Sequence, residues 1–203
     1  MQNKVDYLIA AKVVIDDGRR YLARTEKKFD VITIDPPPPM AAAGSSLLYS
    51  VEMYTIIKKR LKENGVVQQW IPGDEPVTIQ AAARSIAISF PYIRVYHSIE
   101  GWGYHILASM KPFRKLTASE MVSRLPENAR KDLLTWCTDS TIEEYVQRML
   151  SGAVPPDSLL TKEAGPSITD ARPCNEYFLL RQLFGGSRSA LFQKARKIFT
   201  TAL

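Results

Sequence analysis

One carboxylate in this sequence stands in a position suited to proton chemistry. The stretch FDVITIDPPPP runs from an apolar, strand-like segment into Asp35 and then into four prolines. Proline pushes the residue before it toward extended backbone, and a proline run offers no N–H donors that could occupy the carboxylate. A carboxylate held in this way in a cleft can pair with an amine or accept its proton. Asp35 is therefore the first candidate for a general base, and the alternative is an aspartate that caps the following loop.

Other polar residues follow neighbouring strand-like segments. They are the pair Asp16 and Asp17, with Gly18 after it, and the pair Gln68 and Gln69. In open α/β sheets, ligands bind beyond the carboxyl ends of the strands, so the topology predicts that these groups converge with Asp35 on one cleft. An Asp-Gly pair after a strand is also a frequent turn or helix cap, and that interpretation stays open.

Apolar periodicity predicts the elements that position these groups. Strands are expected at 12–16, 30–35, 65–71, 91–97 and 104–110. Helices are expected after Gly18, from Leu47 to Leu61 with an end at Asn64-Gly65, and from a cap at Asp74 through Pro76 to about Ser89. Strands that alternate with helices indicate an α/β fold with a mostly parallel sheet, and the last two strands are expected to pair antiparallel.

The second half of the chain has a helical pattern. Helices are expected at 117–124, 127–136, 140–150, 174–184 and 188–200, with a loop at 152–173. The predicted domains are therefore a partial α/β domain at 1–112 and a helical C-terminal extension at 113–203 that packs on it. The stretch SRSALFQKARKIF is basic. A solvated surface helix is preferred there to a helix that contacts nucleic acid or a membrane.

Composition narrows the function classes. The chain has 203 residues, 45% of them hydrophobic, which is enough for a real core. No segment is apolar over the length that spans a bilayer, and the N-terminus lacks the pattern of a signal peptide, so a cytoplasmic protein is expected. Two cysteines and two histidines are too few to predict a metal site. The net charge is +6, but the aromatic residues are not interleaved with the basic patch, so nucleic-acid binding is not expected.

Longer motifs resemble a known family. The stretches VVIDDGRRYLARTEKKFDVITIDPPPP, LLYSVEMYTIIKKRLKENGVVQQW and ITDARPCNEYFLLRQL resemble the spermidine synthase (aminopropyltransferase) family, above all a bacterial branch often fused behind membrane helices. The resemblance covers about residues 5–110 and 165–185, and corresponds to the second half of the catalytic domain. It implies a Rossmann-like fold of the S-adenosylmethionine-dependent methyltransferase type. It also implies transfer of an aminopropyl group from decarboxylated S-adenosylmethionine to a polyamine such as putrescine.

The resemblance implies roles for individual residues. Asp17, before Gly18, corresponds to the acid that contacts the adenine amino group, and Asp35 to the aspartate that accepts a proton from the attacking amine. The other residues expected at the substrate are Asp16, Gly18, Tyr49, Tyr54 and Gln69. The two tyrosines stand where the family has aromatic residues near the diamine channel, and ordinary packing is the alternative for both.

The sequence departs from the family pattern in two places. The family carries Asp-x-x-Asp after this strand, but the second acid is replaced here by Pro38. The Gly-rich loop and the acidic residue on the next strand, which should precede VVIDDG, are missing, so the sheet is expected to lack its first two strands. Residues 12–16 then move beside 30–35, another subunit fills the gap, or the chain is a fragment.

Three functions follow as hypotheses. The first is a spermidine synthase-like transferase, with the activity of this chain alone left open. The second is a non-catalytic binding or assembly module of the same ancestry, for which a membrane-anchored protein is one candidate partner. The third is an adenosyl-dependent transferase with another acceptor. The apolar strand edge near residues 12–16 needs a cover, which is expected to be a second subunit of a homo-oligomer or the C-terminal helices.

Overall fold

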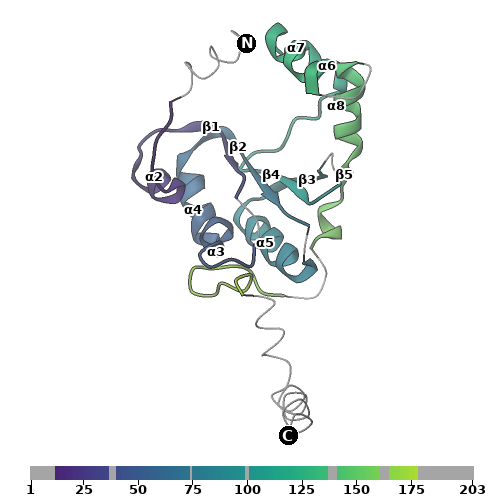
Figure 1. Ribbon diagram of the computed structural model, residues 1–203. Coiled ribbons are helices and arrows are strands. Elements are labelled where there is room, and N and C mark those ends of the chain that lie inside the picture. Colours follow the sequence, from purple (N-terminus) through teal and green to yellow (C-terminus); the bar gives the residue numbers. More distant parts are fainter. Residues whose placement is uncertain are drawn as a thin grey trace, which may run out of the picture.

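The chain folds around one five-stranded sheet. The structure is a computed structural model that describes residues 12–36, 40–73, 75–98, 101–136, 141–160 and 165–177. Its elements are α2 (Gly18–Arg24), β1 (Phe29–Ile34), α3 (Ser46–Tyr49), α4 (Val51–Arg60), β2 (Leu61–Ile71), α5 (Pro76–Ser89), β3 (Tyr92–His97), β4 (Tyr104–Ser109), α6 (Ala118–Arg124), α7 (Glu127–Trp136), α8 (Ile142–Ser151), β5 (Ala153–Val154) and the 3-10 helix η1 (Pro156–Ser158). Figure 1 shows α2 to α5 gathered on one side of the sheet and α6 to α8 near its β5 end.

The strand order is β1-β2-β4-β3-β5. Strands β1 and β2 are parallel, with Ile34 aligned to Gln69, and the remaining pairs are antiparallel. The expected parallel pairing of 30–35 with 65–71 is therefore confirmed, as is the antiparallel pairing of 91–97 with 104–110. The expected open α/β sheet is confirmed as well, but the expectation that it is mostly parallel is wrong: β1–β2 is parallel, and the other three strand pairs are antiparallel.

The expected strand at 12–16 is wrong. These residues form no strand, and the side chains of Val13 and Ile15 are 78% and 99% exposed. In the described part of the chain β1 pairs with β2 alone and forms the edge of the sheet. The β-branched pattern of KVVID favours extended backbone, but a strand also needs a hydrogen-bonded neighbour, and residues 12–16 pair with no strand of the sheet.

The helix expected from Leu47 onward differs in two respects. It is divided at Ser50, whose extended backbone (φ −76°, ψ 154°) lets its Oγ accept the N–H of Met53 at 3.2 Å, as a helix cap does. The second part ends at Arg60 rather than at Asn64-Gly65, because Leu61 already pairs with β1. Helix α5 runs to Ser89 as predicted, whereas the expected cap Asp74 lies outside the described residues.

The core lies on one face of the sheet. Val67, Ile71 and Ile106 from this face pack against Ile57 of α4 and Ile86 of α5, and all five are at most 1% exposed. The opposite face, called here the second face, carries side chains that are exposed or half-buried. Described residues of the second face include Val31, Thr33, Gln68, Trp70, His105 and Leu107.

The C-terminal helices form a cluster of their own. Helices α6, α7 and α8 confirm the helices expected at 117–124, 127–136 and 140–150, and α6 and α8 pack around Ala118, Ile142 and Val146. Residues 174–177 form a turn rather than the start of the expected helix, and residues 178–203 lie outside the described part. None of the described helices is long and apolar enough to cross a membrane. The domain boundary near residue 112 stays a prediction.

Candidate functional site

Asp35 lies directly after the buried end of β1. Its side chain is exposed, whereas Ile34 before it and Pro36 after it are buried. It lines a groove of about 440 Å³ that runs along β1 and is bounded on the other side by α2. Gly18 and Arg19 belong to the same groove. The structure thus brings Asp35 and Gly18 together from segments 17 residues apart in sequence.

The two aspartates before α2 have local partners. Asp17 is the N-cap of α2, and its Oδ1 accepts the N–H of Arg20 at 2.7 Å. Asp16 accepts from Nε of Arg20 at 2.6 Å, and this hydrogen bond is the main cause that lowers the pKa of Asp16. Both carboxylates are at the surface, and Asp17 fixes the start of α2 and therefore the position of Gly18.

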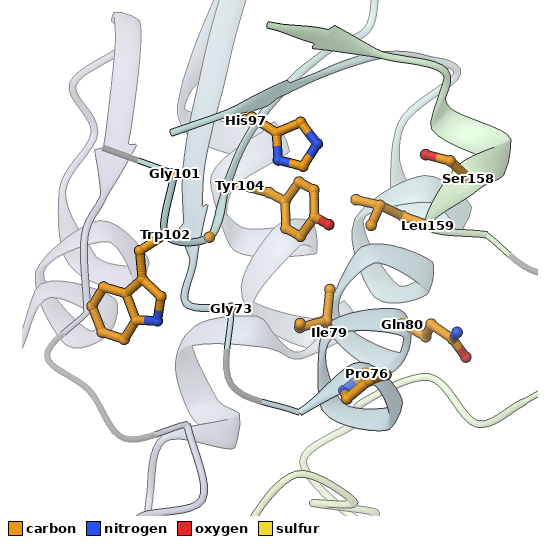
Figure 2. Close-up of a pocket in the computed structure, with 11 residues that line it drawn as sticks. Gly73, Pro76, Ile79, Gln80, His97, Gly101, Trp102, Tyr104, Ser158 and Leu159 are labelled. Carbon is orange, nitrogen blue, oxygen red and sulfur yellow. The ribbon is translucent and has the colours of Figure 1, made fainter. Parts of the chain in front are cut away.

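A second cavity lies apart from the groove that Asp35 lines. It has a volume of about 330 Å³ and lies between α5, η1 and the β3–β4 hairpin. Figure 2 shows the rings of His97 and Tyr104 side by side, directed toward Leu159 and Ile79; their centroids are 4.7 Å apart. The described residues that line this cavity include no carboxylate. The cavity therefore suits a neutral group better than a cation.

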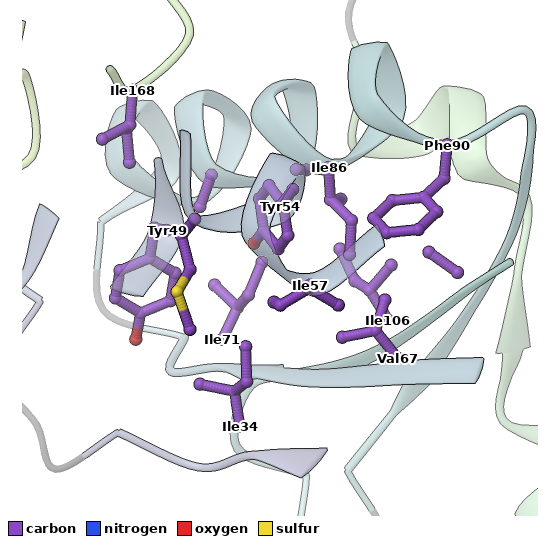
Figure 3. Packing of buried hydrophobic residues seen from close by; sticks show 14 of the residues in the cluster. Ile34, Tyr49, Tyr54, Ile57, Val67, Ile71, Ile86, Phe90, Ile106 and Ile168 are labelled. Carbon is purple, nitrogen blue, oxygen red and sulfur yellow. The ribbon is translucent and has the colours of Figure 1, made fainter. Parts of the chain in front are cut away.

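Tyr49 and Tyr54 lie inside the core (Figure 3), and Gln69 is fully buried as well. Tyr49 is 1% exposed, and burial, with a smaller effect of the Asp35 carboxylate, raises the pKa of its hydroxyl. Tyr54 and Gln69 are both fully buried, and the Tyr54 hydroxyl donates to Oε1 of Gln69 at 3.3 Å. Gln69 in turn donates from Nε2 to the carbonyl of Trp70 at 3.1 Å. These three residues therefore support the site from behind the sheet rather than line its open side.

The second face carries polar and aromatic groups that the sequence reasoning missed. His105 of β4 lies with Nδ1 2.8 Å from Nε2 of Gln68, and Trp70 packs edge-to-face on Trp102 with ring centroids 5.3 Å apart. Burial lowers the pKa of His105, and the charge of Asp35 opposes this effect. These residues are brought together by the strand register alone. The one local sequence signal for this cluster was Trp102, which stands between Gly101 and Gly103.

A strap near the C-terminus holds the elements behind Asp35. We define the strap as residues 167–177. Asp170 pairs with Arg19 of α2, which also donates to the carbonyl of Leu47 at 3.1 Å. Asn175 is fully buried, and its Nδ2 donates to the Met40 carbonyl and to Ser45 Oγ, both at 2.8 Å. The strap therefore connects α2 to the loop that follows the prolines.

Metal ligands do not gather in the described part of the chain. No group of three or more His, Cys, Asp and Glu side chains there could hold a metal ion.

Comparison with known families gives one match to a family model. Residues 9–99 match the spermine/spermidine synthase domain. Asp35, Tyr49, Tyr54 and Gln69 lie within this range, whereas Trp102 and His105 lie beyond it.

Curated polyamine aminopropyltransferases are also similar to this chain. Polyamine aminopropyltransferase 2 of Hyperthermus butylicus is 28% identical over 145 residues, which are 68% of this chain and 47% of the relative. The polyamine aminopropyltransferase of Desulforudis audaxviator is 38% identical over 88 residues, 42% of this chain and 31% of the relative. This chain thus spans half or less of the length of these relatives.

Among solved structures, a spermidine synthase in complex with the transition state analogue AdoDATO is 25% identical. It matches with a TM-score of 0.48 over 78% of this chain and 52% of that chain. The spermidine synthase of Thermotoga maritima is 24% identical, with a TM-score of 0.43 over 66% of this chain and 54% of that chain.

Proposed function

We propose that this chain, whose residues 9–99 match the spermine/spermidine synthase domain, is part of an aminopropyltransferase that acts on a polyamine. The proposed donor is decarboxylated S-adenosylmethionine, and the proposed acceptor is an amine such as putrescine. The position of Asp35 carries the proposal. An exposed carboxylate follows a buried strand and lines a groove with Gly18, at the sheet edge where open α/β folds bind ligands.

The proposed chemistry needs one base. The nitrogen lone pair of the acceptor attacks the methylene carbon next to the sulfonium of the donor. A C–N bond forms as the C–S bond breaks, and the sulfur leaves as a neutral thioether. Asp35 then accepts the proton that the new ammonium loses. A positioned base of this kind typically contributes about 10² to 10⁴ in rate.

The other predicted residues take supporting roles in this proposal. Asp17 caps α2 and places Gly18 at the groove, where a residue without a side chain leaves room for the adenosyl part of the donor. Asp16 holds Arg20 at the same helix start. Tyr49 lies in the core close enough to Asp35 for the carboxylate to affect its pKa. The hydrogen bond between Tyr54 and Gln69 connects α4 to β2.

Two alternatives each have an observation in their favour. A non-catalytic binding or assembly module is favoured by the edge position of β1 and by residues 12–16, which pair with no strand. An adenosyl-dependent transferase with a different acceptor is favoured by Pro38, which stands where the family has its second acid.

Mass spectrometry of the reaction products tests the proposal. The purified chain is incubated with decarboxylated S-adenosylmethionine and putrescine, and calorimetry follows binding of the donor in parallel. We expect an aminopropylated amine and the thioether in equal amounts. Donor binding without transfer to putrescine, but with transfer to another amine, would favour the different acceptor. Neither binding nor transfer would favour the non-catalytic module.

A further inference from the structure

Four segments that are far apart in the sequence meet at the end of the sheet away from the candidate site. Strands β1 and β2 both begin there, with Phe29 aligned to Leu61. Strand β4 ends there and β3 begins there, because Ser109 is aligned with Val66 of β2 and with Tyr92 of β3. The residues before β1, β2 and β3 and after β4 therefore share one surface.

This surface is strongly basic. We define the basic end as residues 24–30, 58–63, 88–94 and 110–115. These segments contain eleven Lys and Arg residues but only three Asp and Glu residues. Their excess of eight positive charges is larger than the net charge of +6 of the whole chain. Positive charge is therefore concentrated at this end of the sheet, where it attracts an anionic surface.

Most of this charge has no direct counter-charge. Within the described part of the chain, the cations of the basic end that pair with a carboxylate are Lys62, Lys111 and Arg114. The other eight Lys and Arg residues form no ion pair there. Lys59 and Lys115 are examples with exposed side chains, on α4 and in the segment that leads to α6. These cations are available to an anionic partner.

Apolar side chains are exposed within the same basic end. Ile88, Tyr92 and Met110 are 62%, 40% and 47% exposed. Ile88 lies in the last turn of α5 just before β3, and Met110 directly follows Ser109, the partner of Tyr92. Isoleucine and methionine side chains add nothing to the binding of nucleic-acid phosphates. At a bilayer they can enter the boundary between headgroups and acyl chains, while a tyrosine remains at the headgroups.

We propose that the basic end binds the surface of a bilayer that contains anionic lipids. The Lys and Arg side chains contact the lipid phosphates, and the three exposed apolar side chains enter the interface between them. This inference goes beyond the proposed function and does not depend on it. Asp35 follows the opposite end of β1, whose six residues span about 20 Å, so the bound chain keeps this carboxylate on the side away from the lipid.

Cosedimentation with vesicles tests the inference. The full chain is mixed with vesicles of phosphatidylcholine and the anionic lipid phosphatidylglycerol, and in parallel with vesicles of phosphatidylcholine alone. We expect the chain to sediment with the anionic vesicles and to stay in solution with the neutral ones. Added sodium chloride should weaken the binding, because salt screens exposed charges.

Two double variants separate the position of the charge from the net charge. Lys59→Gln with Lys115→Gln removes two exposed cations of the basic end. Each cation near an anionic bilayer contributes about fivefold in affinity, so this variant should bind about tenfold to thirtyfold more weakly. Lys131→Gln with Arg172→Gln removes the same charge at exposed positions outside the basic end and should bind within about twofold of wild type.

A second pair of variants tests the apolar contacts. Ile88→Ser should weaken binding to the anionic vesicles about threefold or more, because it removes an apolar side chain from the interface. Met149→Ser changes a 43% exposed apolar side chain of α8, outside the basic end, and should leave the affinity unchanged. Circular dichroism checks that each variant folds.

The outcomes distinguish a bilayer from other partners. Equal binding to both kinds of vesicle, or equal weakening by the two double variants, would overturn the basic end as a binding surface for anionic lipid. Binding to a single-stranded oligonucleotide that Ile88→Ser leaves unchanged, with no binding to vesicles, would identify a nucleic acid as the partner and overturn the bilayer. Binding to anionic vesicles through the basic end, together with no aminopropyl transfer, would support this inference and reject the proposed function alone.

Discussion

Asp35 directly follows Ile34, the residue of β1 that is aligned with Gln69, yet the surroundings of Asp35 and Gln69 give them different roles. Asp35 is exposed, while Gln69 is fully buried and hydrogen-bonded to Tyr54. The exposure of Asp35 could be predicted because it depends on local sequence, a buried strand followed by prolines. The hydrogen bond between Gln68 and His105 could not be predicted, because it depends on a strand register that the sequence does not encode locally.

A pH titration of stability checks the environment of His105. Burial lowers its pKa below the ordinary value of 6.5, so the folded state favours the neutral ring. The stability that this preference contributes is present above about pH 6.5 and is lost as pH falls toward the folded-state pKa. We expect His105→Gln to reduce the fall in unfolding free energy below pH 6.5, measured by urea denaturation. The matched variant His97→Gln, at an exposed position, should follow wild type; a His105→Gln curve that does so too would contradict the assignment.

The buried Tyr54 hydroxyl gives a second prediction. Tyr54→Phe removes its hydrogen bond and leaves Oε1 of Gln69 without this donor in the core. We expect a loss of about 1–2 kcal/mol in unfolding free energy, measured by urea denaturation. The exposed Tyr92→Phe is the control and should change stability by less than about 0.5 kcal/mol. Equal stability of Tyr54→Phe and wild type would show that this hydrogen bond contributes nothing.

Among the elements, the strap explains why the segment after Asp35 keeps its position. Val51 at the start of α4 donates its N–H to the carbonyl of Ile168 at 3.0 Å, and Asp170 N–H donates to Glu52 at 3.0 Å. Residues 152–173 were predicted as a loop, but this range also holds the short strand β5 and the 3-10 helix η1, and only its described residues from 165 onward fit the prediction. Sequence analysis could not predict the partners of the strap, which are more than 100 residues away in the chain.

Asn175 tests the contribution of the strap. Asn175→Ala removes two hydrogen bonds of a fully buried side chain, to the Met40 carbonyl and to Ser45. We expect a loss of about 2 kcal/mol in unfolding free energy, because the carbonyl is left without this donor. Gln147→Ala, an exposed amide on α8, is the matched control. A urea midpoint that does not differ between the two variants would rule out the strap as a support of the loop.

For the whole molecule, the main feature is the sheet edge at β1. The pairing of β1 with β2 and of β3 with β4 was predicted, whereas the pairing of β2 with β4 and the short strand β5 were not. The edge position of β1 was not predicted either, because KVVID looked like a further strand. An edge strand offers unpaired backbone groups to another chain. The exposed apolar side chains of Val13, Ile15 and Val31 lie in or before this edge. The homo-oligomer therefore stays a prediction, and the edge at β1 is the surface through which it would form.

Sedimentation velocity tests that surface. Val31 is 59% exposed on β1, and Val31→Lys places a charge on the edge that opposes strand pairing. We expect wild type to sediment faster as its concentration rises, and Val31→Lys to lose this dependence. Ile88→Lys introduces the same charge at a 62% exposed position of α5 and should behave as wild type. A monomer at every concentration for all three proteins would reject the oligomer.

The most direct test of the proposed function is the rate of aminopropyl transfer by wild type and Asp35→Asn. The matched control is Asp30→Asn, an exposed acid of the same strand that pairs with Lys62. The proposal predicts that Asp35→Asn lowers the rate about 10²-fold or more, with unchanged circular dichroism, while Asp30→Asn retains the wild-type rate. Equal rates for all three proteins would contradict the role of Asp35 as the base.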